Sequence, residues 1–247
     1  MFRYIFALIL FFVFGSAVAV EFSARAVQQY PQGKPRTAVI SVGEDGVRRE
    51  YLQNKKAIID IYRPSKQLRL VIYPGQQAYY QYDGVKIKTG MSDSKKPVST
   101  NPCTESATQR CRMLGREQIN GRLTDKWEVS RKVKNKIIKA LIWVDVERGQ
   151  ALRQFFPDGS RMELLQLKDE RINGRDTEKW VLKLTRPGGK SEQTYQWYDP
   201  QLGIIIKEII PGGYIRELKD IKIGKQPDAL FNVPAGYRKL KIKQPVQ

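Results

Sequence analysis

The sequence predicts a mainly β protein built on one large, curled antiparallel sheet. A unit of about fifty residues occurs twice, many short strand-like segments are separated by turn residues, and no window keeps a helical period over three turns without a glycine or proline. Strands without crossover helices favour antiparallel pairing. Because a sheet of about a dozen strands accumulates twist, it curls or closes, which leaves a barrel, a partial barrel or a sandwich.

The duplication is clearest around two Asn-Gly pairs. Residues 118–127 read QINGRLTDKW, and residues 171–180 read RINGRDTEKW, 53 positions later. Further along, WVD at 143–145 corresponds to WYD at 197–199. Asn-Gly between extended segments predicts a tight hairpin, since both residues tolerate positive φ. The repeat units, 115–167 and 168–220, are therefore predicted to be two copies of one β-meander.

Alternating apolar and polar residues, with turn residues between the segments, define the strands. The predicted strands are 37–42, 47–52, 57–62, 67–73, 77–82, 126–131, 136–146, 152–156, 161–167, 179–185, 193–198, 204–210 and 214–223. Residues 84–112 break this pattern and are rich in Lys, Ser, Thr and Pro. They predict a long surface loop, which is either functional or a disordered insertion.

Residues 1–19 have the pattern of a secretory signal peptide. Arg3 precedes an apolar run from Ile5 to Phe14, and Ala17 and Ala19 form a small-residue cleavage pattern. We expect cleavage after Ala19 and export. A membrane anchor is the alternative, but the apolar run is shorter than the ~20 residues needed to span a bilayer.

The chain has two cysteines, Cys103 and Cys111, and no histidine. Two close cysteines in an exported protein are most simply paired, so we predict a structural disulfide. A metal site would need further Cys or His ligands. We therefore expect no metal and no cofactor.

The chain is strongly basic, with 44 Lys and Arg against 25 Asp and Glu and a formal net charge of +19. Removal of residues 1–19, which hold one arginine and no acid, leaves +18. Such an excess attracts anionic lipid headgroups, lipopolysaccharide, acidic polymers or nucleic acid. Export makes nucleic acid the least expected of these partners, and a solvated basic surface is the simpler alternative.

Two rows of lysine stand out in this basic chain. Lys132, Lys134 and Lys136 are predicted to share one strand face, and the same spacing returns in Lys239, Lys241 and Lys243. Such rows protect exposed sheet edges against aggregation. Anion binding is the alternative role for this basic surface.

Two motifs resemble a family of exported proteins of unknown function. One is GREQINGRLTDKW at 115–127, and the other is the ending DALFNVPAGYRK at 228–239, with its Leu-Phe-x-Val-Pro-x-Gly-Tyr pattern. That group resembles the periplasmic lipoprotein carriers LolA and LolB and the lipoprotein-sorting-like sensor RseB. The resemblance implies a LolA/LolB-like, unclosed (half) β-barrel over a single domain, 20–247, whose apolar interior takes up acyl chains. It also implies a periplasmic location.

Catalysis is not expected. The absence of histidine excludes Ser-His, Cys-His and His-metal sites. A carboxylate pair could still hydrolyse glycosides, but no spacing singles out two residues. The available acids are Asp145, Glu147, Asp158, Glu163, Asp199 and Glu217.

Aromatic and aliphatic side chains of the repeats are the candidate ligand contacts. In a closed sandwich they would fill the core, whereas in an unclosed barrel some would line a cavity. The strand around residues 141–144 is apolar on both faces and needs cover on both. The predicted cavity-lining residues are Leu141, Trp143, Phe155, Phe156 and Trp197.

These observations predict a periplasmic, non-enzymatic binding protein that holds a lipid or the acyl chains of a lipoprotein in an apolar concave cavity, as a carrier or chaperone. The alternative is an envelope interaction or sensor protein with a filled core. Such a protein would use its basic surface to bind an anionic polymer, lipopolysaccharide or a protein partner, including a membrane protein.

Overall fold

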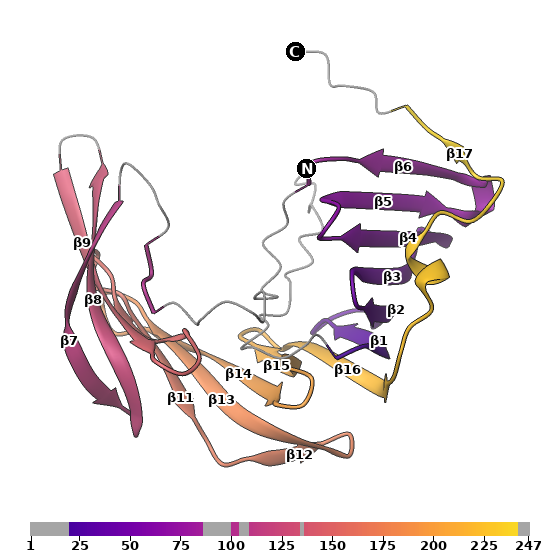
Figure 1. The fold of residues 1–247 in the computed structure, drawn as a ribbon. Coiled ribbons are helices and arrows are strands. Elements are labelled where there is room, and N and C mark those ends of the chain that lie inside the picture. Colours follow the sequence, from indigo (N-terminus) through magenta and orange to yellow (C-terminus); the bar gives the residue numbers. More distant parts are fainter. Residues whose placement is uncertain (1–19, 86–99, 104–108, 134–135, 242–247) are drawn as a thin grey trace. The chain divides into compact units, whose positions relative to one another are not determined.

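The computed structural model describes residues 20–85, 100–103, 109–133 and 136–241 (Figure 1). These residues form seventeen strands and two short 3₁₀ helices, η1 (Pro74–Gln76) and η2 (Asp228–Phe231). The predicted mainly β, antiparallel class is confirmed. No helix in the described part of the chain has the length and apolar character needed to cross a membrane. The predicted signal peptide, 1–19, lies outside the described residues.

The chain divides into two compact units, and all seventeen strands belong to one sheet. The central unit lies within Thr89–Pro211. Its strands are β7 (Gln109–Ile119), β8 (Arg122–Val133), β9 (Lys136–Asp145), β10 (Ala151–Phe155), β11 (Arg161–Gln166), β12 (Glu170–Ile172), β13 (Arg175–Thr185), β14 (Ser191–Asp199) and β15 (Ile204–Ile210). The prediction of one domain over 20–247 stays a prediction.

The central unit is an antiparallel meander. Each strand pairs with the next along the chain, except that β11 and β12 both pair with β13, one at each end of it. Among the described residues, β7 and β15 do not pair with each other, so the sheet of this unit is not closed. Its apolar core contains Ile119, Trp143, Leu152, Leu164, Trp180 and Tyr198.

Both Asn-Gly pairs form the predicted hairpins. Asn120 and Gly121 have φ of 53° and 77°, and Asn173 and Gly174 have φ of 52° and 77°. Ile119 lies opposite Arg122, and Ile172 lies opposite Arg175, so each turn has two residues. Positive φ at both turn positions matches the twist of the flanking strands, which explains why Asn-Gly occurs in both copies.

The terminal unit is built from both ends of the chain. Its strands are β1 (Phe22–Gln29), β2 (Arg36–Gly43), β3 (Gly46–Gln53), β4 (Lys56–Arg63), β5 (Leu68–Tyr73), β6 (Ala78–Tyr82), β16 (Tyr214–Ile223) and β17 (Arg238–Lys239). β1 to β6 form a meander, β16 pairs antiparallel with β1, and β17 pairs parallel with β6. The last described segments therefore complete a sheet that the first strands began.

The closing motif packs over one face of this terminal sheet. Figure 1 shows η2 and its flanking chain crossing the strands from β16 towards β17. Phe231 of η2 is 4% exposed and packs with Ile59, Ile61, Leu70 and Ile72. Leu230, Val233 and Tyr237 pack against the same cluster. The motif that carries the family resemblance thus has an architectural role.

Two sequence predictions need correction. β7 begins at Gln109, inside the range 84–112 that was predicted as a loop. The sequence did not predict this strand because its mostly polar residues do not alternate with apolar ones. Lys132 and Lys136 do not share a strand face, because the chain turns between β8 and β9: Lys132 lies opposite Ile137, and Lys136 lies opposite Val133. Lys134 and Lys243 lie outside the described residues.

The predicted disulfide is confirmed. Cys103 and Cys111 are bonded, with a Cα–Cα distance of 5.9 Å. Nearby, the Thr100 hydroxyl donates a hydrogen bond of 2.7 Å to Asp125 Oδ2 in β8. The bridge and this hydrogen bond together fasten the short segment 100–103 to the β7–β8 hairpin.

Candidate functional site

One face of the central sheet brings the duplicated tryptophans together, and we call it the tryptophan face. Directly opposite residues on neighbouring strands point to the same side of a sheet. Trp143 of β9 begins a row of directly opposite side chains across the sheet, which continues through Arg153, Glu163, Lys183 and Gln193. Trp197 lies four residues beyond Gln193 along β14 and therefore points to the same face.

Trp143 is held by three charged side chains. Its indole N–H donates a hydrogen bond of 2.8 Å to Glu117 Oε2. Lys126 Nζ lies 4.9 Å from the ring centroid and pairs with the same carboxylate at 2.7 Å. On the neighbouring strand, the Arg153 guanidinium lies 5.8 Å from the ring centroid. A cation over an indole contributes about 0.5–2 kcal/mol, depending on desolvation.

Trp197 repeats this arrangement in the second copy. Its N–H donates a hydrogen bond of 2.6 Å to Glu170 Oε2, and Lys179 pairs with that carboxylate at 3.0 Å. Lys179 Nζ and Lys207 Nζ each lie 5.0 Å from the ring centroid. The duplicated sequence therefore produces a duplicated cluster, in which a tryptophan lies between two cross-strand cations and bonds to a glutamate.

Duplicated contacts at the ends of the strands also hold both clusters in place. Arg122 pairs with Asp145, and Arg175 pairs with Asp199. Both aspartates are 1% exposed and also accept backbone N–H groups of the following turn. Thr124 donates its hydroxyl hydrogen to the Glu117 carbonyl, as Thr177 does to that of Glu170. These buried contacts fix the strands that carry the glutamates and tryptophans.

Hydrogen bonds to Glu117 and Glu170 favour the ionised form of both side chains. Those from Lys126 and then Trp143 lower the pKa of Glu117 below its ordinary value. For Glu170 the hydrogen bond from Trp197 is the larger cause and that from Lys179 the next, and its pKa is also lowered. Charge-assisted hydrogen bonds favour the anionic form of the acceptor. Both glutamates therefore stay ionised to a lower pH than an ordinary glutamate does.

The predicted cavity-lining residues divide into buried and accessible members. Trp143 and Trp197 are each 4% exposed. Leu141 is half-buried against the core, and Phe156 is half-buried just after β10. Phe155 is 36% exposed, and its ring meets that of Trp143 edge to face with centroids 5.1 Å apart. Their role in ligand binding stays a prediction, and Phe155 is the most exposed of the five side chains.

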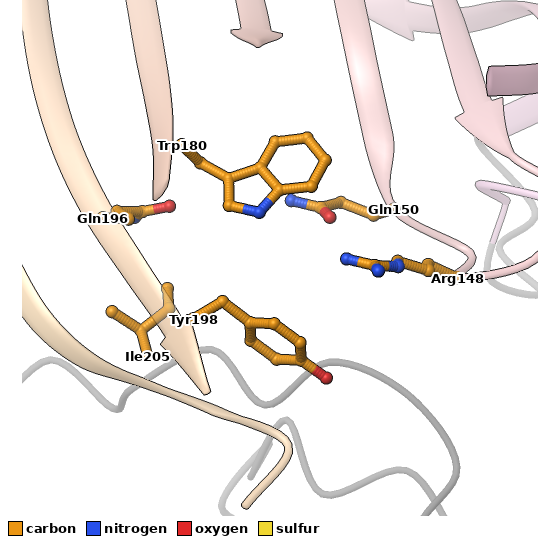
Figure 2. A pocket seen from close by; sticks show the side chains of 6 residues that line it. All are labelled: Arg148, Gln150, Trp180, Gln196, Tyr198 and Ile205. Carbon is orange, nitrogen blue, oxygen red and sulfur yellow. The ribbon is translucent and has the colours of Figure 1, made fainter. Parts of the chain in front are cut away.

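The opposite face holds a shallow pocket that sequence reasoning missed (Figure 2). Arg148 donates two hydrogen bonds to Glu178, at 2.6 and 2.8 Å, and Trp180 N–H donates to the same carboxylate at 3.1 Å. The guanidinium lies 5.7 Å from the ring centroid of Trp180 and 5.5 Å from that of Tyr198. Gln150, Gln196 and Ile205 complete the lining. Arg148 and Glu178 are thirty residues apart, and no local pattern predicts their pairing.

This pocket is too small for a lipid chain. It encloses about 210 Å³ of space, part of which is open solvent, whereas ligand pockets usually hold roughly 300–1,000 Å³. Although burial by itself raises the pKa of Glu178, the hydrogen bonds from Arg148 and Trp180 lower it overall. The guanidinium is thus neutralised by its partner. The arrangement stabilises the β9–β10 connection against β13.

The acids considered for hydrolysis are engaged in structural contacts. Asp145 and Asp199 cap turns and bind arginines, and Glu163 pairs with Arg153 at 3.2 Å. Asp158 accepts hydrogen bonds from Ser160 in the turn after β10. Glu147 pairs with Arg122, and Glu217 with Lys219. In the part of the chain that the structure describes, no group of three acid, Cys or His side chains could hold a metal.

Comparison with known proteins returns solved structures only. No family model and no curated protein sequence matches the chain. A LolA superfamily protein from Nitrosomonas europaea matches with a TM-score of 0.36 and 12% identity, over 88% of this chain and 92% of that one. A lipoprotein-sorting protein domain from Vibrio parahaemolyticus matches with a TM-score of 0.31 and 13% identity, over 87% and 91%.

MucB, an RseB-like protein, matches with a TM-score of 0.34 and 11% identity, over 88% of this chain and 58% of its own. The matched structures include a LolA superfamily protein and an RseB-like protein, the kinds of protein that the exported family suggested by the two motifs resembles in turn.

Proposed function

We propose that the protein is a non-enzymatic binding protein of the periplasm, which holds an acylated, anionic amphiphile on the tryptophan face of the central unit. The observation that supports this most directly is the Trp143–Phe155 pair. Phe155 presents an accessible ring, while Lys126 and Arg153 flank its partner Trp143. An acyl chain would cover the rings, and an acidic headgroup would meet the cations.

Apolar contact is expected to dominate the affinity. Burial contributes about 25 cal/mol per Å², so a few hundred Å² of covered acyl chain outweighs exposed ion pairs worth about 0–1 kcal/mol each. Salt screens exposed charges over about 10 Å at 0.1 M. High salt should therefore slow association of the amphiphile but leave most of its affinity.

The test is a titration with a fluorescent fatty-acid probe at low and high salt. Phe155→Ser should weaken binding at least tenfold at both salt concentrations, because it removes the accessible ring of the pair. Leu123→Ser is the matched control, since Leu123 is 46% exposed on the opposite face of the same sheet. Trp143→Ser should also weaken binding, but it removes a buried ring, so Phe155→Ser is the decisive variant.

Two outcomes contradict the proposal. Binding that disappears at high salt while Phe155→Ser has no effect would identify a polyanion binder. Equal losses in Phe155→Ser and Leu123→Ser would show that the tryptophan face is not the site.

A second candidate function also has an observation in its favour. Trp143 and Trp197 are 4% exposed and tied to glutamates, as expected for a filled core. An envelope interaction or sensor protein would then bind an anionic polymer or a protein through its basic surface. Organic extraction of the purified protein followed by mass spectrometry separates the two, since only an acyl-binding protein should carry lipid through purification.

A further inference from the structure

A second aromatic face lies on the terminal sheet, on the side that η2 does not cover (Figure 1). Directly opposite residues of β3, β4, β5 and β6 point to the same side, and one such row runs from Arg49 through Asp60 and Val71 to Tyr80. η2 packs against Ile59, the neighbour of Asp60, and therefore on the other side. We call the side with this row the tyrosine face. Its partly exposed aromatic members are Tyr51, Tyr73, Tyr80 and Tyr82.

The rings on this face form one cluster. The ring of Tyr80 meets that of Tyr73 edge to face, with centroids 6.0 Å apart, and its centroid lies 6.4 Å from that of Tyr82. Burial raises the pKa of Tyr51 and of Tyr73, so both hydroxyls stay protonated and can donate hydrogen bonds. Each side chain thus offers an apolar body and a polar tip, the combination that enriches tyrosine at interfaces.

Two arginines and an aspartate lie beside these rings. Asp60 is 4% exposed, and it accepts two hydrogen bonds from Arg69, at 2.9 and 3.0 Å, and one from Arg49 at 2.7 Å. A guanidinium has five N–H donors, so both arginines keep donors for a ligand, and 41% of the Arg69 side chain is exposed. With Lys56, the residues of β3–β6 on this face carry three cations and one acid, which leaves a net charge of +2.

This composition distinguishes between partner types. An acyl chain would cover the hydroxyls and guanidiniums without offering them hydrogen bonds, which is unfavourable. A polyanionic polymer is matched by a series of unpaired cations, whereas Asp60 already holds both arginines here. Tyrosine and arginine are enriched at the centres of protein interfaces, and a carboxylate is the group that a guanidinium fork recognises. The face therefore fits a protein segment that carries an aspartate or glutamate next to apolar side chains.

The size of the face limits this partner to a short segment. Four strands about 4.8 Å apart make it about 14 Å wide, and the distance from Arg69 to Tyr73 along β5 is about 13 Å. A standard protein interface covers about 800 Å² on each partner, which is several times this area. A few side chains of an exposed segment fill the face, whereas a folded domain would extend past it.

We propose that the tyrosine face binds a short acidic segment of a partner protein. A carboxylate of the segment binds Arg69 and Arg49, and its apolar neighbours pack against Tyr73, Tyr80 and Tyr82. The site needs no ligand on the tryptophan face. It gives the second candidate function, binding of a protein, a specific surface and a specific kind of partner.

The test begins with a phage-displayed library of random peptides, selected on the purified whole protein. Selected peptides should contain an aspartate or glutamate beside an aromatic or aliphatic residue. The peptide selected most often is then synthesised with a fluorescent label and titrated beside a copy in which each acid is replaced by its amide. The amide copy should bind about tenfold more weakly or worse, because it loses the charge-assisted hydrogen bonds.

Variants of the face then locate the site. Tyr80→Ala/Tyr82→Ala should lower the affinity for the acidic peptide about tenfold or more at both low and high salt, since salt does not screen apolar contact. Arg69→Gln should lower it by a similar factor but leave the affinity for the amide copy within about twofold of wild type. The fatty-acid titration of Tyr80→Ala/Tyr82→Ala should be unchanged, which separates this site from the tryptophan face.

Tyr214→Ala and Arg161→Gln are the matched controls. Tyr214 is 40% exposed on β16, which β1 and β2 separate from β3, and Arg161 is exposed on β11. Both controls should bind the acidic peptide within about twofold of wild type. Circular dichroism and thermal midpoints show whether each variant is folded, and the double tyrosine variant removes no ion pair, so it tests the face independently of Arg69→Gln.

Three results would overturn the proposal. The first is a selection that enriches no peptide on the wild-type protein relative to the Tyr80→Ala/Tyr82→Ala protein. The second is an amide copy that binds as tightly as the acidic peptide. The third is a loss of binding in the two controls as large as in the variants of the tyrosine face, together with competition by dextran sulfate, which would identify a diffuse charge effect.

Discussion

At the scale of single residues, the indole N–H groups of Trp143, Trp180 and Trp197 each donate to a glutamate. Trp127 is the fourth tryptophan and the repeat partner of Trp180, but its buried N–H has no partner in the described structure. The reason lies in the acid two positions earlier. Glu178 in the second copy is Asp125 in the first, and Asp125 bonds instead to Thr100 and Arg116. The two copies have therefore diverged on the face opposite the tryptophan face.

Acid should destabilise the protein through these carboxylates. The pKa values of Glu117, Glu170 and Glu178 are lowered in the folded state, so the unfolded chain takes up protons at a higher pH than the folded one. The stability that they contribute is present above the unfolded value of about 4.3 and is lost as pH falls through the folded values. We expect the urea midpoint, followed by tryptophan fluorescence, to be constant near neutral pH and to fall below about pH 4.3.

A single exchange tests the origin of this pH dependence. Glu117→Gln should flatten the acid limb of the stability curve, because the side chain can no longer take up the proton that breaks its contacts. Glu44→Gln is the control, since Glu44 is an exposed acid in the β2–β3 turn. A Glu117→Gln protein that keeps the wild-type slope below pH 4.3 would show that these contacts do not govern acid unfolding.

At the scale of elements, the β2–β3 turn and η2 depend on each other. A Cβ at Gly46 would lie 2.5 Å from Phe231 Cδ1, and a Cβ at Gly43 would lie 2.6 Å from Phe231 Cε2. The ring is buried in the core of the terminal unit and cannot move away easily. Both glycines are thus required by the close approach of the ring.

Gly46→Ala should therefore destabilise the protein by about 1–3 kcal/mol, the usual cost of overpacking a core. Gly75→Ala is the matched control, because a Cβ there meets nothing within 4 Å and η1 is at the surface. Urea unfolding of the two variants gives the comparison. Equal stability of the two variants would mean that Phe231 does not pack on the turn as described.

Strands were predictable where apolar and polar residues alternate next to a turn residue, as in 67–73, and turns were predictable at Asn120-Gly121. β7 was not, because Gln109–Ile119 is mostly polar and exposed and starts within a Lys- and Ser-rich stretch. Lys132, Lys134 and Lys136 were predicted to share a strand face because no glycine or proline marks a turn among residues 132–136. The glutamates that bind the tryptophans were missed as well, since those contacts join residues 26 and 27 positions apart. The repeated Glu at 117 and 170 was the one available signal.

At the scale of the whole molecule, the disulfide is the covalent link that the sequence predicted correctly. It closes a loop with a sequence separation of 8 and fastens segment 100–103 to the central unit. A loop of this length corresponds to a stabilisation of up to about 2.5 kcal/mol in the chain-entropy description. Cys103→Ser/Cys111→Ser should lower the free energy of unfolding by that amount or less.

Urea unfolding of the oxidised protein, the reduced protein and the double variant measures this loss. The reduced protein and the variant should agree, because both lack the link. Thiol titration of the unfolded, unreduced protein is the direct check, and the finding of two free thiols would contradict the bridge.

The pairing of β16 with β1 and of β17 with β6 has a consequence for biosynthesis. About 130 residues separate the end of β6 from the start of β16, and a ribosome adds about 5–20 residues per second. For roughly 7–26 s, a nascent chain therefore contains β1 to β6 before β16 is available to pair with β1 and before Phe231 can cover Ile59 and Ile61. The central meander, in contrast, can pair each strand as it emerges. The first-made part of the protein is thus the last to be completed, and it is the part that most needs protection by a chaperone before folding.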